Sequence, residues 1–342
     1  MSREKIFKLF ACCFVVKGAR RAAIYDLQRG IFETIPLGLA DILLSYKNAS
    51  YDTLISHFNT DDVKIIDSYF QFLIINEFGF WCRSKSEAER FPEMTKSWDI
   101  PFVISNAVID YESGNYYDLK NAVEKIVKLG VPNVQFRFYS PFNINFLIKL
   151  MELFNASRVK TIEIFTQYIE DDLTENKLRD FCKKFIRLNR LIFFNSPESK
   201  SMNLFNGLTK IQMTEQKMFN DSYCGNIQFN LFRVNKNMFL ESLNFNSCLN
   251  KKLGIDRYGN VKNCPSMKKS FGKISKVDLL KTIENESFKA NWRTNKDKIS
   301  ICKDCEFRYM CVDCRAFTNK NNNKAKPEKC KYNPYLCLWE NK

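Results

Sequence analysis

The sequence predicts an α/β protein built from three consecutive parts, and three observations predict it. Short runs rich in β-branched and aromatic residues precede helical patterns near the N-terminus. Such runs alternate with helical patterns in the middle, and most cysteines gather near the C-terminus. A chain of 342 residues with 45% hydrophobic content can bury enough apolar surface for two or three domains. We expect the parts to cover residues 1–83, 84–245 and 246–342.

The first part contains three expected strands followed by three expected helices. Gly18 and Gly30 mark the turns between the strands. Ser50 is expected to cap the second helix and Asp61 the third, because both side chains accept hydrogen bonds from free backbone N–H groups. The strands cover 5–16, 22–27 and 31–35, and the helices cover 37–46, 50–58 and 62–75.

This order of elements is that of a winged-helix-like module. It resembles the peptide-recognition element of ribosomal peptide maturation systems, and the resemblance implies that the leader of a precursor peptide binds as an added strand. The alternative is a winged helix that binds DNA. Residues 62–72 of the third helix carry one lysine and two aspartates, a poor surface for phosphates, so we expect peptide rather than nucleic acid as the partner.

The middle part begins with a polar segment, 84–99, which we interpret as a linker. Predicted strands then alternate with predicted helices, a pattern typical of a parallel sheet with crossover helices. The strands are 102–109, 133–139, 161–166, 191–195, 210–214 and 228–234, and the helices are 117–129, 144–154 and 175–188.

Eight of the thirteen cysteines lie between Cys248 and Cys337. Cys248 and Cys264 flank a segment with Gly259 in an expected turn, which predicts a hairpin that brings the two thiols together. Downstream, two CxxC pairs are separated by five residues and followed by two more cysteines. This run consists of Cys302, Cys305, Cys311, Cys314, Cys330 and Cys337.

Such spacing is typical of metal ligands, and thiolate-rich sites with almost no imidazole select zinc or iron–sulfur clusters. His57 is the only histidine. Five residues between the CxxC pairs are fewer than the roughly twelve that separate the ligand pairs of common zinc modules. We therefore favour iron–sulfur clusters over an all-cysteine zinc site, and disulfides rank last.

The tail resembles the SPASM domain, the auxiliary-cluster domain of radical S-adenosylmethionine peptide maturases, in its Cys-x10-Gly-x4-Cys and Cys-x2-Cys-x5-Cys spacing. The words Cys-Glu-Phe-Arg-Tyr-Met-Cys and Lys-Pro-Glu-Lys-Cys resemble the grasp-with-SPASM peptide maturases, which are encoded with an ATP-grasp ligase and a short precursor peptide. In that family two [4Fe-4S] clusters are held in crossed order. The family commonly has three residues where Val312 and Asp313 stand here.

The resemblance implies the ligands of both clusters. One cluster is expected on Cys302, Cys305, Cys311 and Cys330. The other is expected on Cys248, Cys264 and Cys314, with a fourth ligand that is either Cys337 or Cys224, unless the position stays open for substrate. The remaining cysteines lack ligand spacing and are expected in the core, and these are Cys12, Cys13, Cys82, Cys182 and Cys224.

The middle part, attached to such a tail, resembles a partial radical-SAM-like β/α barrel, but the CxxxCxxC motif of that family is absent from the 342 residues. We therefore expect a degenerate barrel that does not cleave S-adenosylmethionine. Asp110 and Glu112 stand where the motif belongs, at the end of the first strand, where barrels place function. They are candidate catalytic carboxylates, and the commoner interpretation is that they are solvated loop residues.

These observations favour an iron–sulfur protein that binds a ribosomally made precursor peptide and helps to mature it with an ATP-grasp ligase. Whether the chain itself catalyses a reaction is left open. One alternative is a redox enzyme that modifies peptides with its clusters, and another is a transcriptional regulator that holds a cluster or zinc.

The composition agrees with a cytoplasmic protein that has no membrane partner. No apolar run is long enough to cross a bilayer, and residues 8–17 are too short for a signal peptide. Residues 248–342 carry 22 basic and 10 acidic side chains. This excess forms either a solvated surface or a surface that attracts an acidic partner.

Overall fold

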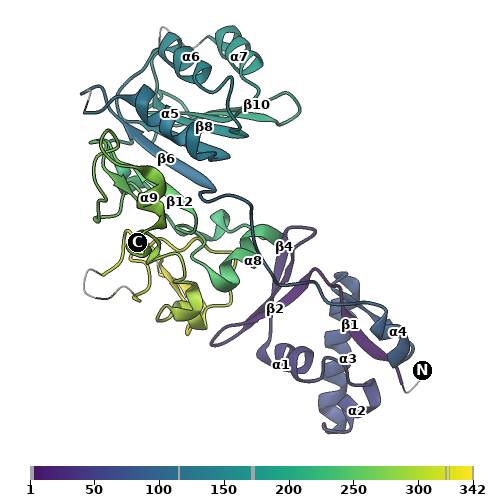
Figure 1. Ribbon diagram of the computed structural model, residues 1–342. Coiled ribbons are helices and arrows are strands. Elements are labelled where there is room, and N and C mark those ends of the chain that lie inside the picture. Colours follow the sequence, from purple (N-terminus) through teal and green to yellow (C-terminus); the bar gives the residue numbers. More distant parts are fainter. Residues whose placement is uncertain (1–3, 115, 171–173, 320–321, 323, 341–342) are drawn as a thin grey trace.

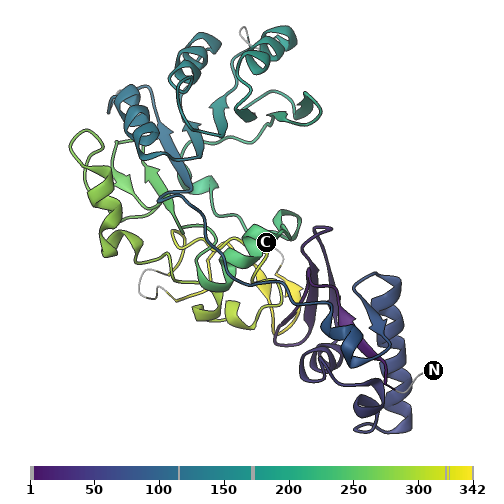
Figure 2. The same ribbon diagram turned by 45° about the vertical axis from the view of Figure 1, so that its right-hand side comes forward.

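The computed structural model describes residues 4–114, 116–170, 174–319, 322 and 324–340. It is a mixed α/β structure whose largest sheet has eight strands, most of them parallel. The N-terminal elements lie at one end of the molecule, the large sheet lies at the other, and the cysteine-rich tail lies between them (Figures 1 and 2).

Two small sheets form the N-terminal region. Strand β1 (Ile6–Leu9) pairs with β5 (Gly79–Cys82), while β2 (Cys13–Lys17), β3 (Ala22–Asp26) and β4 (Ile31–Ile35) form an antiparallel sheet. The strand expected over 5–16 is therefore two strands in different sheets. A turn separates them, in which Cys13 N donates to Phe10 O at 2.8 Å.

Three helices follow β4, as expected, with one difference in capping. Ser50 caps α2 by accepting from Thr53 N. The cap of α3 is Asn59 and not Asp61, because the Asn59 side chain accepts from the N–H groups of Asp61 and Asp62 and so starts the helix two residues earlier. The helices are α1 (Leu37–Ser45), α2 (Tyr51–Ile55) and α3 (Thr60–Ile75).

All five residues of β3 are buried, so both faces of the β2–β3–β4 sheet are covered. On one face Ala22 and Ile24 pack with the helices. On the other face Ala23 and Tyr25 pack with residues of the tail, among them Phe307. Successive side chains of a strand point to opposite faces, which explains the division. The N-terminal sheet is therefore joined to the tail by an apolar core.

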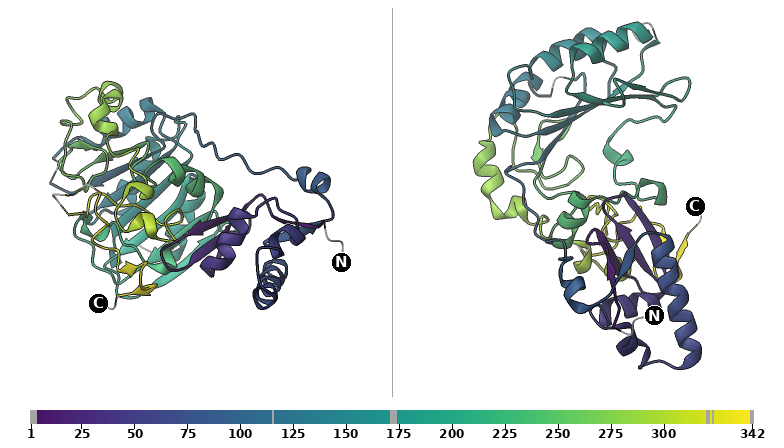
Figure 3. Two further views of the ribbon diagram at one scale, coloured as in Figure 1. Left: turned by 90° about the horizontal axis from the view of Figure 1, so that it is seen from below. Right: turned by 90° about the vertical axis from the view of Figure 1, so that its right-hand side faces the viewer.

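The central sheet has the strand order β10-β11-β9-β8-β7-β6-β12-β13. Three crossover helices connect its parallel strands and lie on the outer side of the curved sheet (Figure 3). Their apolar stripes pack on Ile109, Phe136 and Ile164 from the strands. The elements are β6 (Asn106–Tyr111), α5 (Leu119–Leu129), β7 (Asn133–Phe138), α6 (Ile144–Glu152), β8 (Thr161–Gln167), α7 (Glu175–Lys184), β9 (Leu188–Phe194), β10 (Lys200–Leu204) and β11 (Thr209–Met213).

Two expectations about this sheet differ from the structure. The polar strand β10, which pairs antiparallel with β11 at the sheet edge, was not predicted. The strand expected over 228–234 is wrong, because turn bonds close η3 (Phe229–Leu231) instead, with Leu231 N donating to Gln228 O and Phe232 N to Phe229 O.

The hairpin between Cys248 and Cys264 belongs to the same sheet. Strand β12 (Lys252–Ile255) pairs parallel with β6, and β13 (Val261–Lys262) pairs antiparallel with β12. Gly259 lies in the turn with a φ of 75°, a conformation that glycine adopts readily. The large sheet therefore positions the first two cysteines of the tail directly.

The remainder of the tail has little regular structure. Among the described residues of the whole chain, no helix is long and apolar enough to span a membrane. An extended segment that starts after α4 (Lys85–Glu89) connects the N-terminal region to β6 (Figure 3). The other short elements are η2 (Asp221–Tyr223), α8 (Lys236–Asn244), α9 (Leu279–Glu284), α10 (Glu286–Lys289), η4 (Lys296–Lys298), η5 (Cys302–Asp304), β14 (Tyr332–Asn333) and β15 (Leu338–Trp339).

Candidate cysteine centres

Four cysteines of the tail line one cavity of about 340 Å³ of empty space. They come from η5, from the loop that follows it and from the segment before β14. Three cationic side chains, Lys296, Arg308 and Lys326, line the same cavity. The four thiols belong to Cys302, Cys305, Cys311 and Cys330, the set that the SPASM resemblance implies for one cluster.

Burial and charge act in opposite directions on these thiols. Burial raises the pKa of Cys311 to about 11, and the Lys296 ammonium lowers it. The pKa of Cys302 is likewise raised by burial and lowered by Lys296. A metal ligand is the thiolate, so a cation that binds here displaces protons, and its affinity rises with pH.

A second group of four thiols lies between the hairpin of β12 and β13 and the loop after Cys311. The pKa of Cys264 is raised to about 12 and that of Cys314 to about 11, in both cases mainly by burial and in part by the thiols of Cys248 and Cys224. The Lys252 ammonium lowers the pKa of Cys264 and lies with its Nζ 3.4 Å from Cys248 Sγ. These four thiols are therefore close enough to interact electrostatically.

Cys224 is the fourth member of this group. Because it lacks ligand spacing, the sequence predicts it as a core residue. It is half-buried, and Gly225 follows it with a φ of 77°. A Cβ on Gly225 would lie 2.8 Å from Cys314 Sγ, so the backbone approaches this thiol too closely for any side chain. Of the two fourth-ligand candidates, Cys224 lies beside Cys314, whereas Cys337 interacts with Tyr332, a wall residue of the other cavity.

The thiols of both groups are spread more widely than one zinc ion would hold them. A tetrahedral zinc site with Zn–S bonds of about 2.3 Å places its sulfur atoms about 3.8 Å apart. In the described part of the chain, the only three ligand atoms of His, Cys, Asp or Glu within 4.8 Å of one another are those of Cys12, Cys13 and Asp26. All-thiol groups of this kind, half of whose members are buried, are ligand sets of zinc and of iron–sulfur clusters.

The Cys12, Cys13 and Asp26 group lies outside the tail, and its polar atoms already have partners. The Asp26 carboxylate accepts from the backbone N–H groups of Gln28 and Arg29 and from Arg29 Nε at 2.6 Å. Burial raises the pKa of both thiols, which keeps them protonated. Cys13, Cys82 and Cys182 are buried, as expected for core residues, and Cys12 is half-buried.

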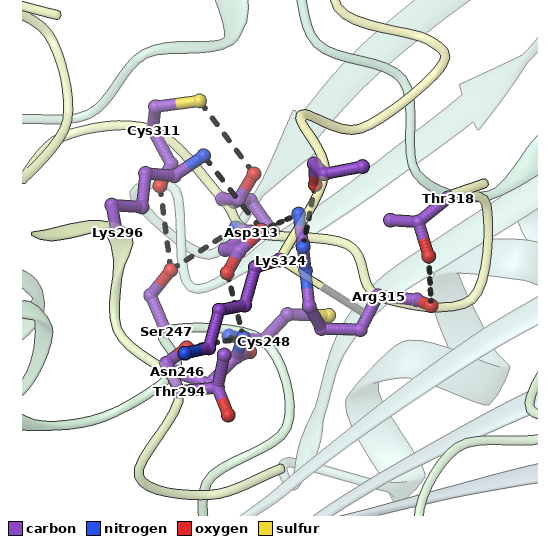
Figure 4. Close-up of polar contacts among 12 residues, drawn as sticks. Asn246, Ser247, Cys248, Thr294, Lys296, Cys311, Asp313, Arg315, Thr318 and Lys324 are labelled. Atoms are coloured by element: carbon purple, nitrogen blue, oxygen red, sulfur yellow. Dashed lines mark hydrogen bonds and ion pairs between the residues drawn. The ribbon is translucent and has the colours of Figure 1, made fainter. Parts of the chain in front are cut away.

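Asp313, which is 1% exposed, connects the two thiol groups (Figure 4). Its Oδ2 accepts from Asn246 Nδ2 at 2.8 Å, and the Asn246 side chain in turn accepts from the N–H group of Cys248. Its Oδ1 lies 4.0 Å from Lys296 Nζ and 2.6 Å from an Arg315 guanidinium nitrogen. One carboxylate therefore touches residues that border each group.

The structure places the candidate carboxylates Asp110 and Glu112 in separate ion pairs. Asp110 lies within β6, which extends to Tyr111, and is 2% exposed. Arg137 donates to both of its oxygens, at 2.6 and 2.8 Å, while burial raises its pKa to about 6. Glu112 accepts from Arg257 at 3.1 Å. Each carboxylate therefore has an ionic partner, Arg137 for Asp110 and Arg257 for Glu112. Neither is a solvated loop residue that lacks such a partner.

No protein-family model and no curated protein matches the chain. Two crystal structures of SuiB from Streptococcus suis are similar to it. SuiB bound to S-adenosylmethionine aligns with a TM-score of 0.34 and 13% identity over 97% of this chain and 100% of that chain. SuiB bound to the precursor peptide SuiA aligns with a TM-score of 0.31 and 11% identity over 94% and 99% of the two chains. A likeness at this level assigns no function.

Proposed function

We propose that the chain is an iron–sulfur protein that binds a ribosomally made precursor peptide and helps to mature it together with an ATP-grasp ligase. The carrying observation is the gathering of eight thiols from distant segments into two groups of four. Residues 246–342 would supply seven of these ligands, residues 84–245 the scaffold and Cys224, and residues 1–83 the peptide site.

Each thiol group would hold one [4Fe-4S] cluster. Cys302, Cys305, Cys311 and Cys330 would hold one, and Cys224, Cys248, Cys264 and Cys314 the other. Such clusters supply one-electron transfer and stabilise the fold that binds them. The protein's own contribution is to bury or half-bury the thiols, to place positive charge beside them and to join the two groups through Asp313.

The N-terminal region offers an edge and a groove to an extended peptide. Strands β2 and β4 are the outer strands of their sheet, and each pairs only with β3 among the described residues. A groove of about 1000 Å³ of empty space runs beside β2. Strand addition satisfies the peptide backbone while alternate side chains enter pockets. The groove is lined by Phe14 and Val15 of β2, by Leu44, Tyr46 and Trp81, and by Lys96.

Binding titrations with the full-length protein test the peptide site. Leu44→Arg puts a charged side chain at the groove, on a position that is 49% exposed, so the helix should still fold. We expect this variant to bind the leader peptide at least tenfold more weakly than the parent. Leu280→Arg is the matched control, because Leu280 is a 52% exposed leucine in α9, outside the groove.

Salt and a DNA duplex distinguish peptide binding from DNA binding. Leader affinity should change little between low and moderate salt, because strand addition is not primarily ionic, whereas duplex affinity falls by orders of magnitude as counterions are released. Specific duplex binding, with no binding of leader or full precursor, contradicts the proposed function.

A further inference from the structure

Each of the two thiol groups has a lysine ammonium beside it. Lys296 is 4% exposed and lines the cavity that the Cys302 group surrounds. Lys252 extends from β12 toward the other group, where its Nζ donates to Cys248 Sγ at 3.4 Å. A buried ammonium is costly unless negative charge lies nearby, so the partners of these two lysines indicate what the sites hold.

Lys296 has an incomplete counter-charge within the protein. Its ion pair with Asp313 is long, at 4.0 Å, and the same Asp313 oxygen lies 2.6 Å from Arg315 (Figure 4). The other groups that interact with Lys296 are the thiols of its own cavity, among them Cys311 and Cys302. Asp313 therefore positions Lys296, while the ammonium of Lys296 remains directed to the thiols.

Lys252 also faces thiols. No carboxylate of a described residue lies within ion-pair distance of its Nζ, and its ammonium interacts with the thiols of Cys248, Cys264 and Cys224 and, beyond ion-pair distance, with the carboxylate of Glu241. The neighbouring lysine, Lys251, points elsewhere and pairs with Asp99. Each thiol group thus has a lysine ammonium beside thiols that lose their protons when they bind a cation, and the Cys302 cavity is lined by Arg308 and Lys326 as well.

We propose that Lys252 and Lys296 are counter-charges, one for each thiol group, and that each raises the reduction potential of the cluster it faces. The inference rests on the proposed function for the presence of the clusters. A nearby positive charge favours the reduced form, which is the more negative one, and net charge is among the factors that set cluster potentials. The lysines are not ligands, and their role is electrostatic.

A redox titration of anaerobically prepared full-length protein, followed by electron paramagnetic resonance, tests this role. The titration of the parent should show two redox transitions, one for each cluster. Lys252→Met should shift one of them to a more negative potential, and Lys296→Met should shift the other. The double variant should move both. Lys296→Arg keeps the charge and should stay near the parent, and Lys64→Met is a control far out on α3, where the lysine side chain is 75% exposed.

Unfolding of the metal-free protein is an independent readout. Without a cluster the two ammonium groups lack the cluster's negative charge, and Lys296 keeps only its long contact with Asp313. Lys296→Met should then unfold at the same temperature as the metal-free parent or at a higher one. A large decrease shows that the lysine is needed for packing and overturns its assignment as a counter-charge.

The remaining outcomes separate this inference from the proposed function. Parent protein without iron overturns both. If the parent contains iron but neither methionine variant changes a reduction potential, the counter-charge role is overturned and the proposed function is not. Lys296→Met could lose its iron altogether. In that case, Lys296→Arg supports the role of charge if it keeps both the iron and the reduction potential of the parent. Loss of iron from both variants overturns the role of charge.

Discussion

Arg21 Nε lies 2.6 Å from Glu306 Oε1, so the N-terminal sheet is ion-paired with the residue that directly follows Cys305. The same short loop accepts two further hydrogen bonds, one from β3 and one from the turn between β2 and β3. Tyr25 Oη donates to Glu306 O at 2.6 Å, and Ala19 N donates to Asp304 O at 2.8 Å. The proposed peptide-binding region therefore rests on the segment that carries three of the thiols of one proposed cluster.

Glu306→Gln should loosen this contact. Glu306 is fully buried and also accepts from Tyr332, whereas the Arg21 side chain is 32% exposed, so water offsets part of the loss. We expect a destabilisation of about 1–3 kcal/mol, seen as a lower thermal midpoint and faster proteolysis after residue 90. Asp41→Asn breaks the exposed Lys17 pair and should cost about 0–1 kcal/mol. Equal effects of the two variants contradict the account.

Cys224→Ala and Cys337→Ala identify the fourth ligand of the cluster proposed on Cys248, Cys264 and Cys314. Cys224 interacts with Cys264 and Cys314, so its loss should lower the iron content or make that cluster oxygen-labile. Cys337→Ala should keep the iron of the parent. Cys182→Ala is the control for loss of a buried thiol, since Cys182 packs in the core of the large sheet. Iron loss in Cys337→Ala alone assigns the ligand to Cys337 instead.

Glu241 gives the protein a defined pH dependence. Burial raises its pKa from 4.5 to about 7, against a hydrogen bond from Asn250. Between pH about 4.5 and 7 the folded state holds a proton that the unfolded state has lost, so this residue lowers the free energy of unfolding as pH rises. Glu241→Gln should match the parent near pH 5 and unfold at a higher temperature near pH 8. Glu286→Gln, at an 85% exposed side chain, should show no such change.

The absence of CxxxCxxC predicts the outcome of a cofactor assay. Reduced protein mixed with S-adenosylmethionine should release no 5′-deoxyadenosine above background, because the end of β6 carries an Asp110–Arg137 ion pair where three thiolates would be required. Chromatography of the quenched mixture measures the product. Robust release contradicts the prediction and shows that the cofactor is bound elsewhere.

Local patterns were sufficient to predict most elements of this fold. Apolar periodicity predicted α3 and α5, and the hairpin of β12 and β13 followed from two cysteines around Gly259. The errors arose where local signals competed. Asn59 and Asp61 are both good helix caps, and polar β10 carries little strand signal because it lies at a sheet edge.

Long-range placement could not be predicted in the same way. Cys224 lies outside the cysteine-rich tail, and the sequence offered it only as an alternative to Cys337, whereas the fold brings it beside Cys314. The Asp110–Arg137 pair depends on the register of β6 against β7, which no local pattern defines. The resemblance to the SPASM domain implied the set around the Cys302 cavity, whereas proximity in the sequence would have chosen Cys314, three residues after Cys311, in place of Cys330.

Metal analysis of protein purified without oxygen shows whether the two thiol groups hold iron–sulfur clusters. If each thiol group holds one [4Fe-4S] cluster, the protein should be brown and contain about eight iron and eight sulfide ions per chain. Mössbauer or absorption spectra should show cubane clusters, and Cys311→Ala should lose about half of the iron. Colourless protein with stoichiometric zinc and no sulfide would contradict the account.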